Sequence, residues 1–393
     1  MSVTAARGFV AAGGAVGIKT DGAPDVAVVA TEGGRAVPAA GVFTQNRAAA
    51  APVRVSVRHL RETRGRAAAV VLTSGNANAA TGDAGMAAAD QLCELVAAEV
   101  GVQALEVLVC QTGLIGVPFP TAVLSRVPGV VAARAAGPAA AVAAATAIMT
   151  TDTVRKEAVA RGPGGRGGGF TVGGMAKGAA MLAPDMATML AVLTTDAQVD
   201  AATLQGVLAA AVGPTFNSID VDGCTSTNDT VLLLASGAAG PVDADALAGA
   251  VGEVCAALAE QMVADAEGAT KVARVTVTGA LSDADAHRAA RQVAGSLLVK
   301  CSLNGEDPYW GRVVSELGSA GVAFELERTT VRYGGTVVCA AGAAMPHDAG
   351  AVAAHMAGRT IEIACDLGLG GGRGAVLTTD LGYGYIDENR TTS

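Results

Sequence analysis

Short runs rich in β-branched residues alternate with longer alanine-rich stretches along the whole chain. β-Branched side chains favour extended strands, whereas alanine has the highest helix propensity. A chain that alternates the two is expected to build sheets covered by helices, so the pattern predicts a mixed α/β protein. The predicted strands span residues 67–73, 105–110, 230–235, 272–278 and 360–366. The predicted helices span residues 84–101, 201–213, 244–267 and 283–294.

The core of this protein has to be built from small and aliphatic side chains. Hydrophobic residues make up 51% of the 393 residues, but aromatic residues make up only 3%, and there are 52 glycines. Alanine, valine and leucine must therefore fill the core, and close approaches between backbone segments are expected. The hydrophobic fraction excludes disordered and collagen-like chains, and the length suggests two or three domains.

Charge and hydropathy exclude several classes of partner. The 27 lysine and arginine residues and 36 aspartate and glutamate residues give a net charge of −9, and no basic block is present that could follow a nucleic acid backbone. Mean hydropathy is +0.42, but prolines and glycines interrupt the longest uncharged stretches, so we expect no membrane-spanning segment. The N-terminus does not resemble a signal peptide, which favours a cytoplasmic location.

Metal and disulfide chemistry are not indicated. The seven cysteines are scattered without a C-x-x-C pair, which is typical of reduced, mostly buried thiols. The four histidines form no pair at a metal-binding spacing. We therefore expect neither a metal nor a cofactor.

A nucleophile that needs no histidine is offered by the segment around residues 173–190. Lys177 lies among small residues there, and a Pro–Asp turn leads to Thr188 at the start of an apolar run. If the backbone were cut between Ala187 and Thr188, the threonine would carry a hydroxyl nucleophile and an α-amino group that acts as its base. Taken alone, the pattern favours the simpler interpretation that Thr188 begins a buried strand.

Two further segments carry hydroxyl groups where a site could form. Thr112 and Gly113 follow a predicted strand, so the hydroxyl of one and the backbone N–H of the other are suited to stabilise an oxyanion. Thr150 and Thr151 belong to a group of threonines around Asp152, which suits either a helix cap or a polar substrate. Taken alone, the first segment is only a turn, and the second is more simply a cap.

These segments belong to an ordered set of motifs that resembles the glutamate N-acetyltransferase (ornithine acetyltransferase) family of arginine biosynthesis bifunctional proteins. The resemblance covers nearly the whole chain, and eight motifs occur in the family's order, so coincidence does not explain it. The motifs are residues 74–78 (SGNAN), 111–116 (QTGLIG), 148–152 (IMTTD), 174–178 (GMAKG), 186–190 (MATML), 225–229 (TSTND), 265–268 (DAEG) and 310–312 (WGR).

The resemblance implies a fold, a maturation step and an activity. The implied fold is a layered αββα sandwich of the N-terminal-nucleophile type over residues 1–280, with a C-terminal α/β unit over residues 281–393. Self-cleavage between Ala187 and Thr188 would give an α chain and a β chain that assemble as an α2β2 heterotetramer. The implied activity is ping-pong transfer of acetyl from N2-acetyl-L-ornithine to L-glutamate through an acetyl-threonine intermediate. Some relatives also use acetyl-CoA as a donor.

The resemblance also implies roles for individual residues. Thr188 is implied to be the nucleophile, and Thr112 and Gly113 the oxyanion site. The implied substrate-binding positions are Thr150 or Thr151, Lys177, Glu267, Asn389 and either Thr392 or Ser393. Lys177 would supply a local cation for the α-carboxylate of both substrates, which the net charge of the protein otherwise repels. Glu267, at the expected end of a helix, would face the ornithine ammonium or would simply be a solvated helix end.

Other functions stay open at this point. A hydrolase or aminopeptidase could use the same nucleophile with water as the acceptor, and a paralogue could serve secondary metabolism. A catalytically silent binding protein would retain the fold but remain uncut. Tyr309, where the family usually has asparagine, and a tail one residue shorter than usual concern substrate preference rather than the class of reaction.

Overall fold

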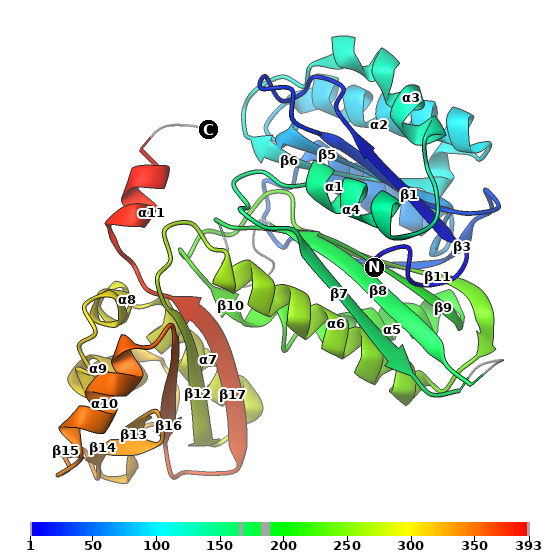
Figure 1. Cartoon of the computed structure of the whole chain (residues 1–393). Coiled ribbons are helices and arrows are strands. Elements are labelled where there is room, and N and C mark those ends of the chain that lie inside the picture. The colour runs from blue at the N-terminus through cyan, green and yellow to red at the C-terminus, as the bar shows by residue number, and fades with distance from the viewer. Residues whose placement is uncertain (1, 165–167, 182–188, 391–393) are drawn as a thin grey trace. The chain divides into compact units, whose positions relative to one another are not determined.

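The computed structural model describes residues 2–164, 168–181 and 189–390 (Figure 1). Contacts divide the chain into two compact units. The first unit contains Met1–Asn217 and Cys224–Met262, and the second contains Ser218–Gly223 and Val263–Ser393. Both units are built from helices and strands in alternation, so the prediction of a mixed α/β protein is confirmed.

Two sheets form the centre of the first unit. One has four strands in the order β1 (Phe9–Gly14), β2 (Val26–Thr31), β5 (Ala69–Asn76) and β6 (Val107–Leu114). The other has six strands in the order β4 (Arg66–Ala67), β3 (Val37–Phe43), β11 (Thr230–Pro241), β9 (Leu190–Gln198), β8 (Phe170–Lys177) and β7 (Lys156–Gly162). Within them, β6 runs parallel to β5, and β9 runs parallel to β11 and antiparallel to β8.

Helices cover the outer face of each sheet, which gives four layers (Figure 1). One hydrophobic cluster joins β1, β2, β5 and β6 to β8, β9 and β11, and α4 (Pro138–Ala147) adds its alanines to it. A second cluster packs the other face of the first sheet against α1 (Ala51–Glu62), α2 (Gly82–Val100) and α3 (Val127–Ala132). The other face of the second sheet is covered by α5 (Ala201–Val212) and α6 (Ala244–Ala264). The αββα sandwich expected from the resemblance is therefore confirmed.

The close packing of these layers explains why the chain is rich in glycine and poor in aromatic residues. A Cβ added to Gly13 of β1 would lie 2.1 Å from the carbonyl oxygen of Ala143 in α4, so the helix can approach the strand this closely only at a glycine. Strands buried on both faces have continuous apolar sequences rather than alternating ones, as residues 69–72 of β5 show.

Helix α6 is the one described helix that is long and apolar enough to cross a membrane, judged by length and composition alone, whereas the sequence analysis expected no such segment. Half of its apolar window is buried. Val254 and Leu258 pack on Gly174 of β8, and the Gln261 side chain exchanges hydrogen bonds with the backbone of Glu157 in β7. In this structure α6 is thus a covering helix of the second sheet.

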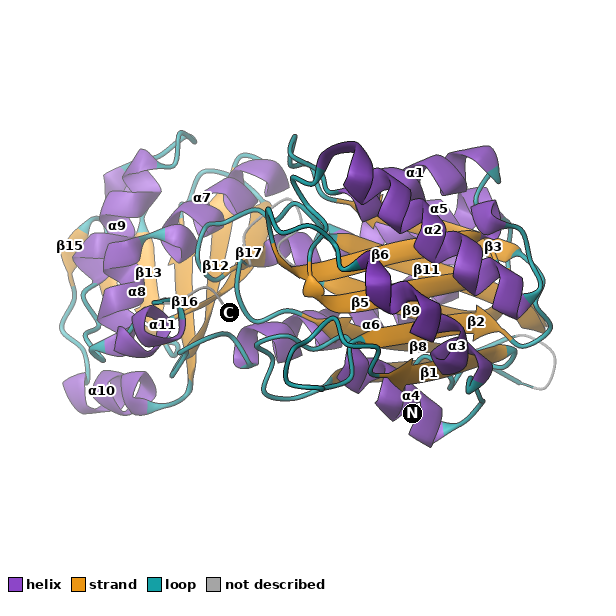
Figure 2. Ribbon diagram, turned by 90° about the horizontal axis from the view of Figure 1, so that it is seen from above, coloured by secondary structure: helices purple, strands orange, loops and turns teal. Residues whose placement is uncertain are grey.

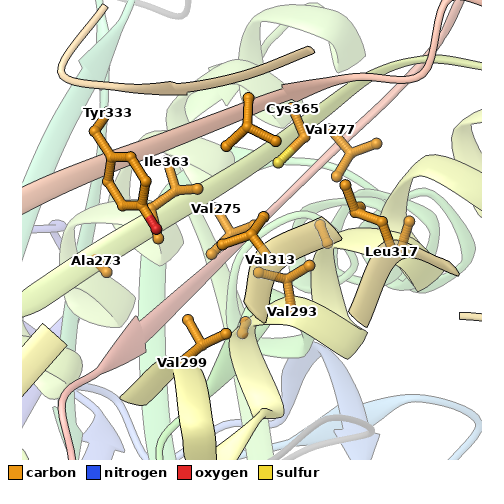
Figure 3. Packing of buried hydrophobic residues seen from close by; sticks show 14 of the residues in the cluster. Ala273, Val275, Val277, Val293, Val299, Val313, Leu317, Tyr333, Ile363 and Cys365 are labelled. Carbon is orange, nitrogen blue, oxygen red and sulfur yellow. The ribbon is translucent and has the colours of Figure 1, made fainter. Parts of the chain in front are cut away.

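The second unit is a single sheet with helices packed on one face. The strand order is β10 (Ile219–Asp220), β17 (Gly372–Thr379), β12 (Val272–Ala280), β16 (Thr360–Asp366), β13 (Thr330–Tyr333), β14 (Thr336–Ala340) and β15 (Ala343–Ala344). The helices are α7 (Asp283–Gly295), α8 (Leu297–Asn304), α9 (Trp310–Ser319) and α10 (Ala349–Ala357), and the short helix α11 (Tyr383–Glu388) follows β17. Figure 2 shows helices lying over these strands, and Figure 3 shows the core between them, where Val275, Ile363 and Tyr333 of the sheet meet Val293 and Leu317 of the helices.

The second unit begins earlier than the expected boundary at residue 280. Strand β12 pairs with β16 on one side and with β17 on the other, so it belongs to the C-terminal sheet rather than to the sandwich. The short strand β10 also pairs with β17, which places residues 218–223 in this unit. Because both edges of β12 are hydrogen-bonded, this strand is a central strand of the C-terminal sheet. The sequence around β12 has no local signal for these two partners. Short 3-10 helices at Ala104–Glu106, Thr121–Arg126, Phe216–Ser218 and Leu326–Arg328 complete the described elements.

Candidate functional site

The predicted oxyanion residues lie at the end of a strand, as expected. Thr112 is buried in β6, and Gly113 follows it with its backbone exposed at φ +130°. A Cβ added to Gly113 would lie 2.3 Å from the carbonyl carbon of Gly75, so this close approach of β5 and β6 requires glycine. The strand register shifts at Asn76, which opposes both Thr112 and Leu114. The bulge breaks the regular ladder beside Gly113, a geometry common next to active sites.

Asp152 forms the centre of a buried ionic cluster. Its carboxylate accepts hydrogen bonds from the Lys156 ammonium at 2.5 Å, from the Gly178 backbone N–H at 2.7 Å and from the Thr150 backbone N–H at 2.9 Å. The Lys177 ammonium lies 3.8 Å from the second carboxylate oxygen. Burial raises the pKa of Asp152, but the charges of Lys177 and Lys156 outweigh it and hold the pKa well below its usual range.

This arrangement excludes the helix-cap interpretation of residues 150–152. Helix α4 ends at Ala147 before the segment, and the next element is the strand β7. The Asp152 carboxylate instead links β7 to the end of β8 through Lys156 and Gly178. Thr150 is half-buried beside it, whereas Thr151 is exposed.

The cluster carries an excess of positive charge. Lys156 and Lys177 are both buried and share the charge of Asp152, which gives a net charge of +1 within a protein whose net charge is −9. Lys19 adds a third ammonium, which donates hydrogen bonds to the backbone carbonyls of Met149 at 2.7 Å and Pro24 at 2.9 Å. Burial lowers the pKa of Lys19, and the nearby charge of Lys177 acts in the same direction. A buried cluster with an excess of positive charge suits an anionic group of a substrate.

Lys19 also places this cluster close to the oxyanion segment. A Cβ added to Gly75 would lie 3.0 Å from Cγ of Lys19, so the lysine stem packs on the residue that Gly113 approaches. Thr112, Gly113, Thr150 and Lys177 therefore belong to one region of the first unit, although they come from distant parts of the sequence.

The cleavage position, Ala187 and Thr188, lies outside the described residues, but the chain that follows it is well placed. Strand β9 begins at Leu190, which pairs with Lys177 at the end of the antiparallel strand β8. Met189 is buried, and its backbone N–H donates a hydrogen bond to the Asp229 carboxylate at 2.9 Å. The prediction that this strand lies inside the sheet is confirmed, because β9 is flanked by β8 and β11.

The remaining predicted binding residues belong to the second unit. The Asn389 side-chain amide donates a hydrogen bond to a Glu267 carboxylate oxygen at 2.8 Å. Glu267 lies three residues beyond the end of α6 at Ala264 and is buried, so the alternative of a solvated helix end is wrong. Thr392 and Ser393 lie outside the described residues. Tyr309 is exposed, and its ring centroid lies 5.5 Å from the Arg312 guanidinium carbon.

Several residues of the first unit's site were missed by sequence reasoning. Lys19 and Lys156 were given no role from the sequence, because neither has a local sequence signal. Asn228 and Asp229 were noted only as part of a motif, yet both are buried next to the site. Within the described ranges, no group of three histidine, cysteine or acidic side chains is arranged to hold a metal ion. All seven cysteines are free, and five are buried, as expected.

The fold is thus an αββα sandwich with a buried, net-positive lysine cluster near a strand-end glycine. A family model described as the ArgJ family matches residues 10–391, so the chain belongs to the ArgJ family. The arginine biosynthesis bifunctional protein ArgJ of Mycolicibacterium paratuberculosis is 50% identical over 100% of this chain and 96% of its own. Its Streptomyces coelicolor namesake is 46% identical over the full length of both.

Solved structures also match. An ornithine acetyltransferase from Mycobacterium tuberculosis, complexed with ornithine, is 42% identical over 48% of this chain and 96% of its own, with a TM-score of 0.42. The Bacillus halodurans arginine biosynthesis bifunctional protein is 36% identical over 50% of this chain and 96% of its own, with a TM-score of 0.49.

Proposed function

We propose that the protein transfers an acetyl group from N2-acetyl-L-ornithine to L-glutamate, after self-cleavage between Ala187 and Thr188. Family membership over the full chain supports the reaction class. The observation that carries the proposal is the position of Lys177, a buried cation that pairs in register with Leu190, two residues after the proposed nucleophile. Both substrates carry an α-carboxylate, and Lys177 is the group suited to bind it.

Maturation needs no group other than the threonine and water. The Thr188 hydroxyl attacks the carbonyl carbon of Ala187, the C–N bond breaks, and the acyl group moves to the oxygen as an ester. Water then hydrolyses the ester, which leaves a carboxylate on Ala187 and a free α-amino group on Thr188. That amine has a reference pKa of about 8, so a modest loss of hydration leaves enough of it neutral to act as a base at pH 7.

Transfer then occurs in two half-reactions. The Thr188 oxygen gives its proton to the α-amino group and attacks the acetyl carbonyl, and the backbone N–H of Gly113 and the hydroxyl of Thr112 stabilise the oxyanion. The C–N bond of the acetyl amide breaks, and the departing ornithine amine takes up the proton from the α-amino group of Thr188. Ornithine then dissociates, and the acetyl group stays on Thr188 as an ester. The amino group of glutamate attacks the ester carbonyl carbon, the C–O bond to Thr188 breaks, and N-acetylglutamate leaves. The proton that the attacking amine loses passes to the threonine oxygen.

Further groups complete the proposal. Thr150 or Thr151 donates a hydroxyl to the bound substrate, and Glu267 with Asn389 binds the ornithine ammonium. The terminal hydroxyl of Thr392 or Ser393 assists them, and acetyl-CoA serves as a second donor. We propose that no metal or cofactor takes part, that the two cleavage fragments assemble as α2β2, and that the enzyme acts in the cytoplasm on small molecules, with neither nucleic acid nor membrane as a partner.

Isotope exchange tests this function. A ping-pong enzyme should exchange label between N2-acetylornithine and free ornithine when glutamate is absent, because the acetyl-enzyme forms without the acceptor. Thr188→Ala should abolish both exchange and self-cleavage. Exchange that requires glutamate would contradict the acetyl-enzyme, whereas release of free acetate that excess glutamate does not suppress would favour the hydrolase.

A further inference from the structure

The motif at residues 225–229 has no role in the mechanism above, yet it touches both halves of the site. It immediately precedes β11, whose first residue, Thr230, lies in parallel register with Leu190 of β9. Asn228 and Asp229 are 3% and 0% exposed. Their side chains reach two different strands, and each contacts the backbone immediately next to a proposed catalytic residue.

Asn228 contacts the strand that carries the oxyanion residues. Its side-chain amide donates hydrogen bonds to the carbonyl of Gln111 at 2.8 Å and to the carbonyl of Ala77 at 2.6 Å. The Gln111 carbonyl belongs to the peptide group that continues into Thr112. The Gln111 side chain is itself fixed between the amide of Asn78 at 2.8 Å and the hydroxyl of Thr73 at 3.1 Å. The peptide group that leads into the oxyanion segment is therefore held from several directions.

Asp229 contacts the strand that follows the nucleophile. One carboxylate oxygen accepts the hydrogen bond from the Met189 N–H, and the Met189 carbonyl accepts one from the Thr230 N–H at 3.2 Å. The second carboxylate oxygen is buried and has no hydrogen-bond partner among the described residues. A buried polar atom without a partner costs stability, so this oxygen calls for an explanation.

The environment of the Asp229 carboxyl group also shifts its pKa. Burial raises its pKa well above the usual range, although the Met189 N–H, Ser226 and the charge of Lys177 oppose the shift. The carboxyl group offers an acceptor oxygen to the Met189 N–H in either protonation state. Asparagine has the same shape and offers the same acceptor, which makes Asp229→Asn a conservative replacement here.

We propose that Asn228 and Asp229 form a positioning pair that sets the spacing between the oxyanion segment on β6 and the backbone that follows the nucleophile on β9. This inference rests on the proposed function, because it assigns the pair to the same reaction. Neither residue acts on the substrate in this account. The pair acts through Gln111 and Met189, whose neighbours Thr112 and Thr188 do the chemistry.

Three variants of the full chain test the pair, and a fourth serves as the control. A misplacement of about 1 Å costs on the order of 100-fold in rate, so we expect Asp229→Ala and Asn228→Asp to slow self-cleavage and lower kcat by about that factor with little change in KM. Asn228→Asp replaces two donors by acceptors that face two carbonyl oxygens. Asp229→Asn should restore cleavage and kcat to within about tenfold of the wild type, because the acceptor is kept.

Asp196→Asn is the matched control. Asp196 is a buried carboxylate on β9 that accepts a backbone hydrogen bond from the Thr171 N–H at 2.7 Å and pairs with the exposed Arg7 guanidinium at 2.9 Å, near the end of the strand that lies away from Met189. It should change neither cleavage nor kcat. Self-cleavage is followed by intact mass, kcat by transfer to glutamate, and folding by circular dichroism and thermal unfolding.

Three outcomes overturn the inference. Asp229→Ala that cleaves and turns over like the wild type removes the pair from the mechanism. Asp229→Asn that folds but is as slow as Asp229→Ala shows that the carboxyl group acts by its proton and not by position. A wild-type protein that neither cleaves nor transfers acetyl refutes the proposed function itself, and the pair falls with it. Rescue by asparagine together with an unchanged control supports the pair.

Discussion

Replacing Asp152 by asparagine should destabilise the first unit, because Lys156 and Lys177 both lose the carboxylate that they contact in the core. The side chains of Asp152 and Lys156 are fully buried, and that of Lys177 is 3% exposed, so water cannot replace the lost charge. Breaking a buried ion pair by removing one partner costs about 3–5 kcal/mol. For a unit of this size each kcal/mol lowers Tm by about 2 °C, so we expect a fall of about 6–10 °C.

Thermal unfolding followed by circular dichroism at pH 7 measures this effect. Adding Lys156→Met to Asp152→Asn should recover a large part of the lost Tm, because one of the two uncompensated cations is then removed. Asp200→Asn serves as the control and should leave Tm unchanged, since Asp200 is an exposed N-cap of α5 and asparagine caps a helix about as well as aspartate. A single variant as stable as the wild type, or a double variant no more stable than the single one, would refute the account of the cluster.

The same carboxylate predicts a dependence of stability on pH. The pKa of Asp152 is lowered in the folded protein, so its contribution is complete above the unfolded pKa of about 3.9 and is lost as the pH falls through the still lower folded pKa. The difference in free energy of unfolding between wild type and Asp152→Asn should therefore be constant from pH 5 to 7 and should shrink below about pH 4. A gap that stays constant down to pH 2 would show that charge is not its cause.

Three substitutions test the proposed roles of single residues. Lys177→Ala should raise KM for glutamate about 10- to 100-fold through the loss of a charge-assisted hydrogen bond, and steady-state kinetics with an unchanged KM would remove Lys177 from carboxylate binding. Gly113→Ala places a Cβ against Gly75 at a positive φ, so kcat should fall about 100- to 1000-fold; a normal kcat would show that this N–H does not stabilise the oxyanion. Glu267→Gln should raise KM for N2-acetylornithine about tenfold and leave acetyl transfer from acetyl-CoA to glutamate unaffected. Equal effects on both donors would argue against an ammonium site.

Local signals in the sequence predicted most of the elements but not their boundaries or pairing. The predicted strand at residues 360–366 coincides with β16, because its apolar and polar residues alternate with the period of a half-buried strand. The helix predicted to reach residue 267 ends at Ala264, since a turn follows and Glu267 is buried beyond it. The assignment of β12 to the C-terminal sheet depends on partners about 90 residues away, which no local pattern reports.

In the candidate site, too, some residues could be predicted from local sequence and others could not. Gly113 was predicted because a strand end, a hydroxyl and a glycine are adjacent in the sequence. The buried ionic cluster could not be predicted, because Lys19, Lys156 and Lys177 come from separate segments and a lysine in a polar segment is ordinarily exposed. The hydrogen bond between Glu267 and Asn389 joins residues that the family resemblance named separately and that spacing alone would not pair.

The most direct test of the central claim is the intact mass of the denatured protein before and after incubation with N2-acetylornithine, with N-terminal sequencing of each fragment. In proportion to 38.4 kDa for 393 residues, a cut after Ala187 gives fragments of about 18 and 20 kDa. The account predicts that the larger begins Thr-Met-Leu-Ala and gains about 42 Da, located on Thr188, when the donor is present without glutamate. A single uncut chain that transfers acetyl, or an acetyl group on any other residue, would contradict it.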